Sequence, residues 1–116
     1  MAAPEAVQEE RNALVVDRGV TWLVAPDGVR YELASRTAPR RVLRRLVQEA
    51  QSGDALVSLD ELLEAGWPGE QPVYETGRNR VHVALAALRK TGLRDVIQRL
   101  DGGYRIDPRQ PVRIVD

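Results

Sequence analysis

The amino-acid sequence predicts an α+β domain that begins with an N-terminal antiparallel β-meander, continues with three helices and ends in a C-terminal β-hairpin. Short β-favouring runs separated by turn residues fill the segment 13–33. From about residue 38 onward, apolar residues recur at the spacing of an amphipathic helix instead. Two further short runs flank the turn residues 101–103. At 116 residues the chain has the size of one domain, which buries enough surface to fold without a metal or a disulfide.

The meander is predicted from three runs, 14–16, 20–24 and 29–33, that are rich in valine, leucine and aromatic residues. Glycine-containing turns at 17–19 and 26–28 separate these runs. The residues before the meander, 1–12, are acidic and polar, and we expect them to form a disordered tail. We therefore place the folded domain at 13–108 and treat 109–116 as a C-terminal extension.

The first helix is expected from about Ala38 to Gly53, with arginines on one face and apolar residues on the other. Its apolar face consists of Val42, Leu43, Leu46, Val47 and Ala50.

The second helix has a sequence-encoded start and stop. Ser58 and Glu61 have the spacing of a capping box, and Val57 and Leu62 have the spacing of a hydrophobic staple. We expect Gly66 to end this helix in the left-handed conformation that glycine adopts readily. Its buried stripe is expected to contain Leu59, Leu62 and Leu63.

The third helix is expected from Arg78 to Thr91, with its end at Gly92. Its buried edge follows the helical repeat and consists of Val81, Ala84, Leu85 and Leu88. The segments 96–100 and 104–106 are expected to pair as a hairpin around residues 101–103, where glycine permits a tight turn.

The composition excludes several classes of function. The chain has no cysteine, which excludes disulfides, a thiol nucleophile and a cysteine zinc site, and agrees with the reducing cytoplasm in which we place the protein. His82 is the only histidine, and no glycine-rich phosphate loop occurs. We therefore expect no enzymatic activity, no metal and no cofactor. No apolar run is long enough for a membrane span, so a membrane is not an expected partner.

Charge is unevenly distributed along a chain whose formal net charge is zero. Segment 36–45 contains five arginines and no acid, and segment 78–99 contains six basic residues and one aspartate. Segment 46–77 between them contains seven acidic residues and no base. If the two basic segments share a face, the domain has a polarised surface that would orient it on an anion. The alternative is that these arginines only keep exposed helix faces soluble.

Three stretches of the sequence resemble a known family. They are the 59–63 run with its following Trp67, the Val81–Leu85 run that leads to 88–90, and the 103–106 stretch in the hairpin. The chain resembles the winged helix-turn-helix output domain of OmpR/PhoB-type response regulators over about residues 13–108. It is more similar still to a bacterial variant set with a Gly-Trp-Pro-Gly-Glu stretch, here 66–70, and an Asn-Arg-Val-x-Val-Ala-Leu stretch, here 79–85. The resemblance implies a winged-helix fold and a role in bacterial transcription regulation.

The resemblance also implies that the third helix and the hairpin, or wing, contact double-stranded DNA. The start of the third helix is expected to place basic and polar side chains near its free backbone amides, which favour phosphate. Our candidate DNA-contacting residues are Arg78, Asn79, Arg80, His82, Val83, Arg89, Lys90, Arg94 and Arg99. A homodimer is compatible with this class of regulator, in which dimers and larger assemblies are common.

Four residues depart from the response-regulator pattern. Ala86 and Ala87 stand where polar or basic side chains commonly reach bases and phosphates, and neither can make a bidentate contact to guanine. Ala84 replaces a polar group, and Asp101 replaces a base at the tip of the wing.

These departures support a second hypothesis, in which the domain is a protein-interaction module without DNA binding. Its contact surface would then be formed by Val83, Ala86 and Ala87, whose small apolar side chains permit close approach of another protein. The plain alternative to DNA contact at the start of the third helix is that Arg78 and Arg80 are simply solvated and that Asn79 helps to cap the helix.

Overall fold

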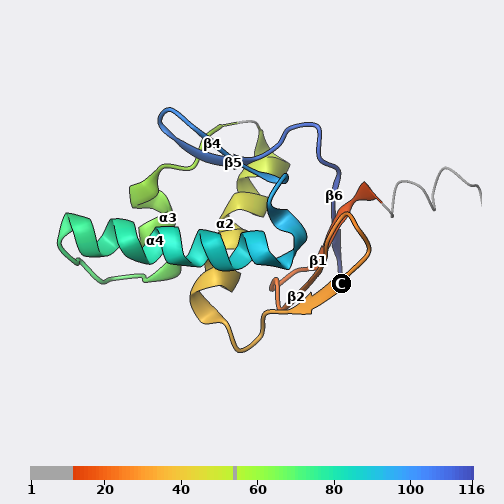
Figure 1. The fold of residues 1–116 in the computed structure, drawn as a ribbon, viewed down its shortest axis with the longest axis horizontal. Helices are drawn as coiled ribbons and strands as arrows, with labels where there is room; N and C mark the ends of the chain where they lie inside the picture. The colour runs from red at the N-terminus through yellow and green to blue at the C-terminus, as the bar shows by residue number, and fades with distance from the viewer. Residues whose placement is uncertain (1–11, 54) are drawn as a thin grey trace, which may run out of the picture.

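The computed structural model of the chain describes residues 12–53 and 55–116, in which three helices and two sheets form an α+β fold (Figure 1). The predicted tail lies outside this part except for Asn12, which is exposed. The strands are β1 (Leu14–Asp17), β2 (Trp22–Val24), β3 (Arg30–Glu32), β4 (Ile97–Leu100), β5 (Gly103–Ile106) and β6 (Val112–Val115). The helices are α2 (Thr37–Ser52), α3 (Leu59–Gly66) and α4 (Tyr74–Leu88), which continues into the wide turn η1 (Arg89–Leu93).

The first sheet contains the predicted meander and one strand more. Its order is β3-β2-β1-β6, with antiparallel pairing among the first three strands. Strand β6 pairs in parallel with β1, from Leu14 opposite Val112 to Asp17 opposite Val115. In Figure 1 the end of the chain accordingly runs back beside its first strand. The residues expected to form a C-terminal extension therefore complete the sheet, and the folded part does not end at residue 108.

The first two helices begin where the sequence predicts, because their local signals are strong. The residues Val42, Leu43, Leu46 and Val47 of α2 are buried, as expected. In α3 the amide of Glu61 donates to Ser58 Oγ at 3.1 Å, and the amide of Ser58 donates to Glu61 Oε1 at 3.3 Å. The predicted capping box is therefore formed.

The end of α3 differs from the prediction. Gly66 is the last helical residue and is buried, and Trp67 follows as the cap with a φ of −136°. The positive φ, 78°, occurs at Gly69 instead. The prediction of a left-handed cap at Gly66 was therefore wrong, because the chain remains helical there while Gly66 packs against α2, where a Cβ would lie 3.3 Å from Val42.

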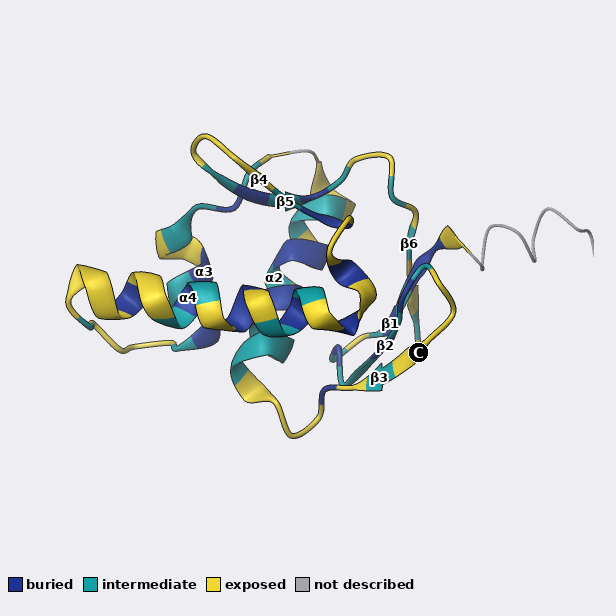
Figure 2. Cartoon of the chain, in the orientation of Figure 1, coloured by how far each residue is buried: buried dark blue, intermediate teal, exposed yellow. Residues whose placement is uncertain are grey.

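Helix α4 begins at Tyr74, one turn before the predicted start at Arg78. Gly77 precedes the predicted start, but it is buried within the helix. A Cβ there would lie 2.8 Å from Leu63 Cδ2 of α3. Glycine at this position permits α4 to pass close to α3. The predicted buried edge is confirmed, since Val81, Ala84, Leu85 and Leu88 are all buried (Figure 2).

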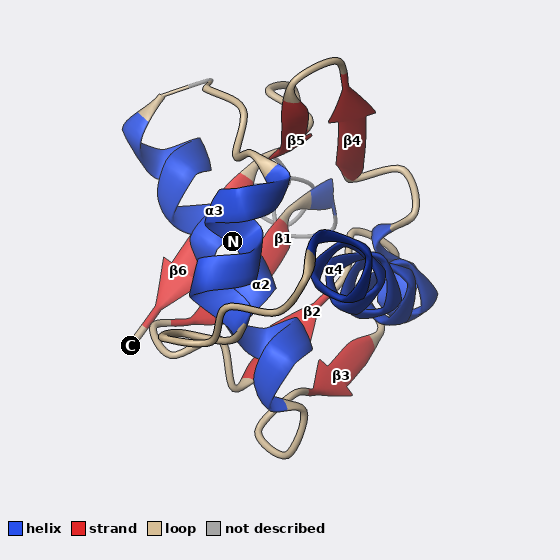
Figure 3. Ribbon diagram, turned by 90° about the vertical axis from the view of Figure 1, so that its left-hand side faces the viewer, coloured by secondary structure: helices blue, strands red, loops and turns tan. Residues whose placement is uncertain are grey.

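The hairpin forms as predicted, with Ile97 opposite Ile106 and Leu100 opposite Gly103. The segment before α3 also pairs with this hairpin. The amide of Val57 donates to the Tyr104 carbonyl at 2.7 Å, and the amide of Tyr104 donates to the Val57 carbonyl at 2.9 Å. Figure 3 shows α4 nearly along its axis, with the hairpin strands above it. The hairpin and α4 therefore border the same side of the domain.

The helices and the two sheets share one hydrophobic core. Leucine and valine side chains from β1, α2 and α4 are among its fully buried members. No helix in the described residues has the length and apolar character needed to cross a bilayer.

Candidate nucleic-acid interface

Helix α4 presents a mixed outer strip opposite its buried edge. Asn79, Val83, Ala86 and Lys90 recur at intervals of three or four residues and are exposed, so they form one strip along the helix. Val83 is the most exposed apolar member, at 61%. This strip places an amide, two apolar groups and an ammonium on the surface that projects from the body of the domain.

A row of basic residues follows the side of α4 nearest the hairpin. Arg78, His82 and Arg89 are spaced four and seven residues apart, which places them on one side of the helix. Arg99 of β4 approaches the same place, because its charge acts on the His82 imidazole together with those of Arg78 and Arg89. We call these four residues the cationic cluster.

The pKa of His82 lies below its ordinary value. Partial burial is the larger cause, and the positive charges of Arg78, Arg99 and Arg89 add to it. Both causes favour the neutral imidazole at pH 7.

The cationic cluster has no counter-ion within the described part of the chain. Its three arginines make no ion pair or side-chain hydrogen bond among residues 12–53 and 55–116. No side-chain nitrogen or oxygen in those residues is both buried and unpartnered, so the imidazole nitrogens of His82, which have no partner, contact solvent. Like charges held together without an acid repel one another, and an anion bound among them would relieve that repulsion.

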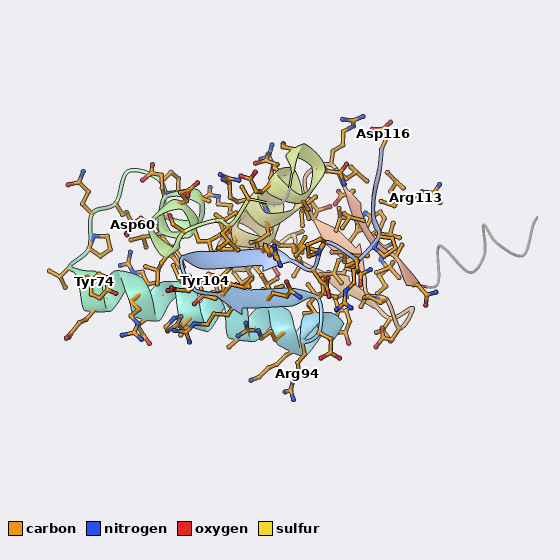
Figure 4. All side chains as sticks on the ribbon, turned by 90° about the horizontal axis from the view of Figure 1, so that it is seen from above. Asp60, Tyr74, Arg94, Tyr104, Arg113 and Asp116 are labelled. Atoms are coloured by element: carbon orange, nitrogen blue, oxygen red, sulfur yellow. The ribbon has the colours of Figure 1, made fainter. Side chains whose placement is uncertain are left out.

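Two more candidate cations extend this surface past the end of α4. Lys90 and Arg94 are both exposed. Figure 4 shows Arg94 projecting away from the body of the domain, at the opposite end of the helix from Tyr74. Together with the cationic cluster, they place basic groups along the length of α4.

Arg80 lies on the other side of α4 and is held by the loop that follows α3. Its Nη1 atom is 2.7 Å from Glu70 Oε1, and its guanidinium lies 5.9 Å from the centre of the Trp67 ring. The expected first-turn placement was wrong for both Arg78 and Arg80, because the earlier start of α4 puts Glu75 in the first turn. Asn79 likewise does not cap the helix, since the cap residue is Val73, without a side-chain hydrogen bond.

An apolar groove of about 430 Å³ borders Arg80 and separates α4 from the start of α2. The protein-interaction hypothesis named Val83, Ala86 and Ala87 as a contact surface. Val83 and Ala87 line this groove, and Ala86 does not. The remaining lining residues are Ser35, Arg36, Ala38, Pro39, Trp67, Asn79, Arg80 and Ala84.

The arginines of the first basic segment are divided between two places: three face α3, and Arg36 lines the apolar groove together with Arg80 of the second segment. Arg41, Arg44 and Arg45 of α2 line a hollow together with Glu61 and Glu64 of α3. Arg45 bridges two carboxylates there, at 3.1 Å to Glu49 and 2.9 Å to Glu61. Arg45 is therefore paired with the acidic segment, as Arg80 of the second basic segment is through Glu70. The three arginines of the cationic cluster have no such ion pair among the described residues.

Sequence reasoning identified the members of the cationic cluster but not their arrangement. It missed the roles of Trp67 and Glu70 in holding Arg80, because no spacing rule relates a loop carboxylate to a helix ten residues later. Asp101 is exposed at the turn of the hairpin, as expected. The described residues contain no group of three or more histidine, aspartate or glutamate side chains placed to hold a metal ion.

Comparisons with known proteins give no family for this chain: no protein-family model matches it, and neither a curated protein nor a solved structure does. The function is therefore argued from the geometry of the domain itself.

Proposed function

We propose that this domain is a winged helix that binds double-stranded DNA and serves in bacterial transcription regulation. Helix α4 would enter the major groove, which has the width to admit an α-helix, and the β4–β5 hairpin would lie against the neighbouring backbone. The observation that supports this most directly is the cationic cluster, four basic side chains from α4 and β4 with no counter-ion among the described residues. The phosphates of a duplex supply the missing negative charge.

The residues of α4, η1 and β4 divide between two tasks in this proposal. Arg78, Arg89 and Arg99 neutralise phosphates and so position the domain without reading sequence. The outer strip faces the base edges, where the amide of Asn79 suits adenine and the ammonium of Lys90 suits guanine. Val83 and Ala86 in the same strip suit the methyl group of thymine, so the alanines do not by themselves exclude readout of DNA.

The experiment that tests this proposal is a titration of fluorescently labelled mixed-sequence duplex at several salt concentrations. We expect affinity to fall steeply with salt, because bound phosphates release counter-ions. Arg78→Ala and Arg89→Ala should each weaken binding to all sequences and lower the slope of log affinity against log salt by about 1.

Arg44→Ala is the matched control for these variants. It also removes one exposed arginine from a helix, but in the hollow beside α3, so we expect the salt slope to stay unchanged. If the duplex does not bind even at low salt, or if all three variants behave alike, the proposal is wrong.

The apolar groove supports a second candidate function, docking of a protein segment. Its apolar lining includes Trp67, Val83 and Ala87, and the charged residues among its lining are the arginines Arg36 and Arg80. A segment with one apolar anchor and a flanking carboxylate would complement this combination. Binding by such a segment would not require the cationic cluster, so absence of DNA binding would favour this function over the first.

A further inference from the structure

We propose that DNA binding by this domain is coupled to the uptake of one proton by His82, which then donates a hydrogen bond to a backbone phosphate held within the cationic cluster. This inference rests on the proposed function and adds a condition to it. The phosphate would be bound by two elements at once, since Arg78, His82 and Arg89 come from α4 and its end, and Arg99 comes from β4.

The position of His82 makes it the central member of the cluster. It follows Arg78 by one helical turn and precedes Arg89 by two, and the charge of Arg99 reaches it from the hairpin. The charged groups that act on its ring are these three cations, from its own helix and from β4. An anion bound among these three cations therefore also acts on the His82 ring.

The state of His82 before binding sets the direction of the coupling. Burial first, and then the three arginines, lower the pKa of His82, so the free protein holds the ring neutral at pH 7. A phosphate placed among the cations offsets their charge and favours the imidazolium, which raises the pKa of His82 in the complex. Because the complex then binds more protons than the free protein, affinity must rise as the pH falls between the two pKa values.

The chain offers an unambiguous probe for this coupling, because His82 is its only histidine. No other side chain has an ordinary pKa between those of the carboxylates and neutral pH. The first measurement is an NMR titration of the His82 ring protons from pH 5 to pH 8, without and with saturating 20-base-pair duplex at fixed ionic strength. We expect the midpoint to move to higher pH when the duplex is bound.

The second measurement is the affinity for the same duplex at pH 7.0 and pH 5.5. We expect affinity to increase about threefold to tenfold on acidification, since uptake of one proton changes affinity by at most tenfold per pH unit. His82→Gln keeps hydrogen-bonding capacity without titrating. At pH 5.5 this variant should therefore bind the duplex more weakly than the unaltered protein does, and its affinity should not depend on pH. His82→Lys remains charged across this range, so it should bind at pH 7.0 as tightly as the unaltered protein does at pH 5.5, and also without pH dependence.

Two results would overturn the inference while leaving DNA binding in place. One is a duplex that binds without moving the His82 midpoint, and the other is a His82→Gln variant that retains the full pH dependence. Absence of duplex binding at low salt and at both pH values would instead contradict the proposed function. Circular dichroism of each variant shows whether a lost effect comes from unfolding.

Discussion

Gly92 determines how the long third helix ends against the first sheet. Its φ is 83°, in the left-handed region that favours glycine, and a Cβ there would lie 2.7 Å from the Cβ of Ala25. The sequence predicts the end of the helix from this glycine, since a glycine after a helical repeat is a common stop. It did not predict the contact with Ala25, because that depends on how the turn after β2 packs beside η1.

We predict that Gly92→Ala destabilises the domain by about 2–4 kcal/mol, because the new methyl group adds a steric contact to the cost of the left-handed backbone. Gly28 has a φ of 89°, but a Cβ there would meet nothing within 4 Å beyond its chain neighbours, so Gly28→Ala isolates the backbone cost, about 1–2 kcal/mol. Gly53 is extended and open, and Gly53→Ala should change stability by less than about 0.5 kcal/mol. Urea unfolding of the three variants measures these values. Equal costs at Gly92 and Gly28 would contradict a steric contribution from Ala25.

Single residues also show why the candidate site was only partly predictable. The basic side chains of α4 are visible in the sequence, and helical spacing places Arg78, His82 and Arg89 on one side. The approach of Arg99 and the capture of Arg80 by Glu70 depend on how the hairpin and the loop after α3 fold back. Sequence spacing contains no information about such contacts between elements.

At the scale of elements, start signals predict helices well only where a side chain supplies them. The Ser58 capping box marked α3 correctly, whereas α4 begins after Val73, which makes no side-chain cap. The predicted start at Arg78 leaves out Gly77, and a glycine weakens a helix in isolation. Close packing of α4 against Leu63 outweighs the weak helix propensity of glycine. Such packing depends on the whole fold, so the local sequence does not predict it.

We predict that Ser58→Ala destabilises the domain by about 1 kcal/mol, because the amide of Glu61 then loses its acceptor. Ser35→Ala is the control, since Ser35 is exposed and makes no side-chain hydrogen bond in the described residues. Urea unfolding gives the two values. A second readout follows from Glu61, whose pKa is lowered chiefly by hydrogen bonds with Ser58 and further by Arg45.

In Ser58→Ala the pKa of Glu61 should rise only part of the way toward its ordinary value, because the backbone amide at position 58, the largest cause of the lowering, still donates to Glu61 Oε1. NMR of the Glu61 side chain can follow this rise. The lowered pKa of Glu61 also makes the stability of the fold depend on pH. A carboxylate with a lowered pKa stabilises the fold above its ordinary pKa and loses that contribution as the pH falls through the lowered value. The stability difference between the two proteins should therefore shrink in acid, and a difference that grows in acid would contradict this assignment.

At the scale of the whole molecule, the sequence predicted the order of elements as far as the hairpin but predicted neither β6 nor its place in the sheet. The meander and the hairpin were expected because their partners are adjacent in the chain and their turns have recognisable residues. Strand β6 pairs with β1 from the other end of the described chain, and nothing in either segment specifies that pairing. Local sequence therefore predicts strands that pair with a neighbour along the chain better than a strand that pairs with a distant segment.

We predict that deletion of residues 109–116 destabilises the domain by about 2–4 kcal/mol, because β1 loses a row of hydrogen bonds and Val112 leaves the edge of the core. If residues 109–116 lay outside the fold, their deletion would leave the free energy of unfolding nearly unchanged. Ile114→Ala is the control, since this side chain is 40% exposed and its truncation should cost less than about 1 kcal/mol. Thermal unfolding distinguishes these outcomes, and a deletion variant that melts with the intact protein would contradict a structural role for β6.

The parallel pairing of β1 with β6 has a consequence for synthesis of the protein in the cell. Leu14 is synthesised long before Val112. Until β6 is available, the backbone groups of β1 that pair with it have no partner strand, while the helices and the hairpin can already form. An uncovered strand border invites pairing with other chains. Pairing with β6 removes the hydrogen-bonding edge of β1 from contact with other chains and makes β6 the border strand of the sheet.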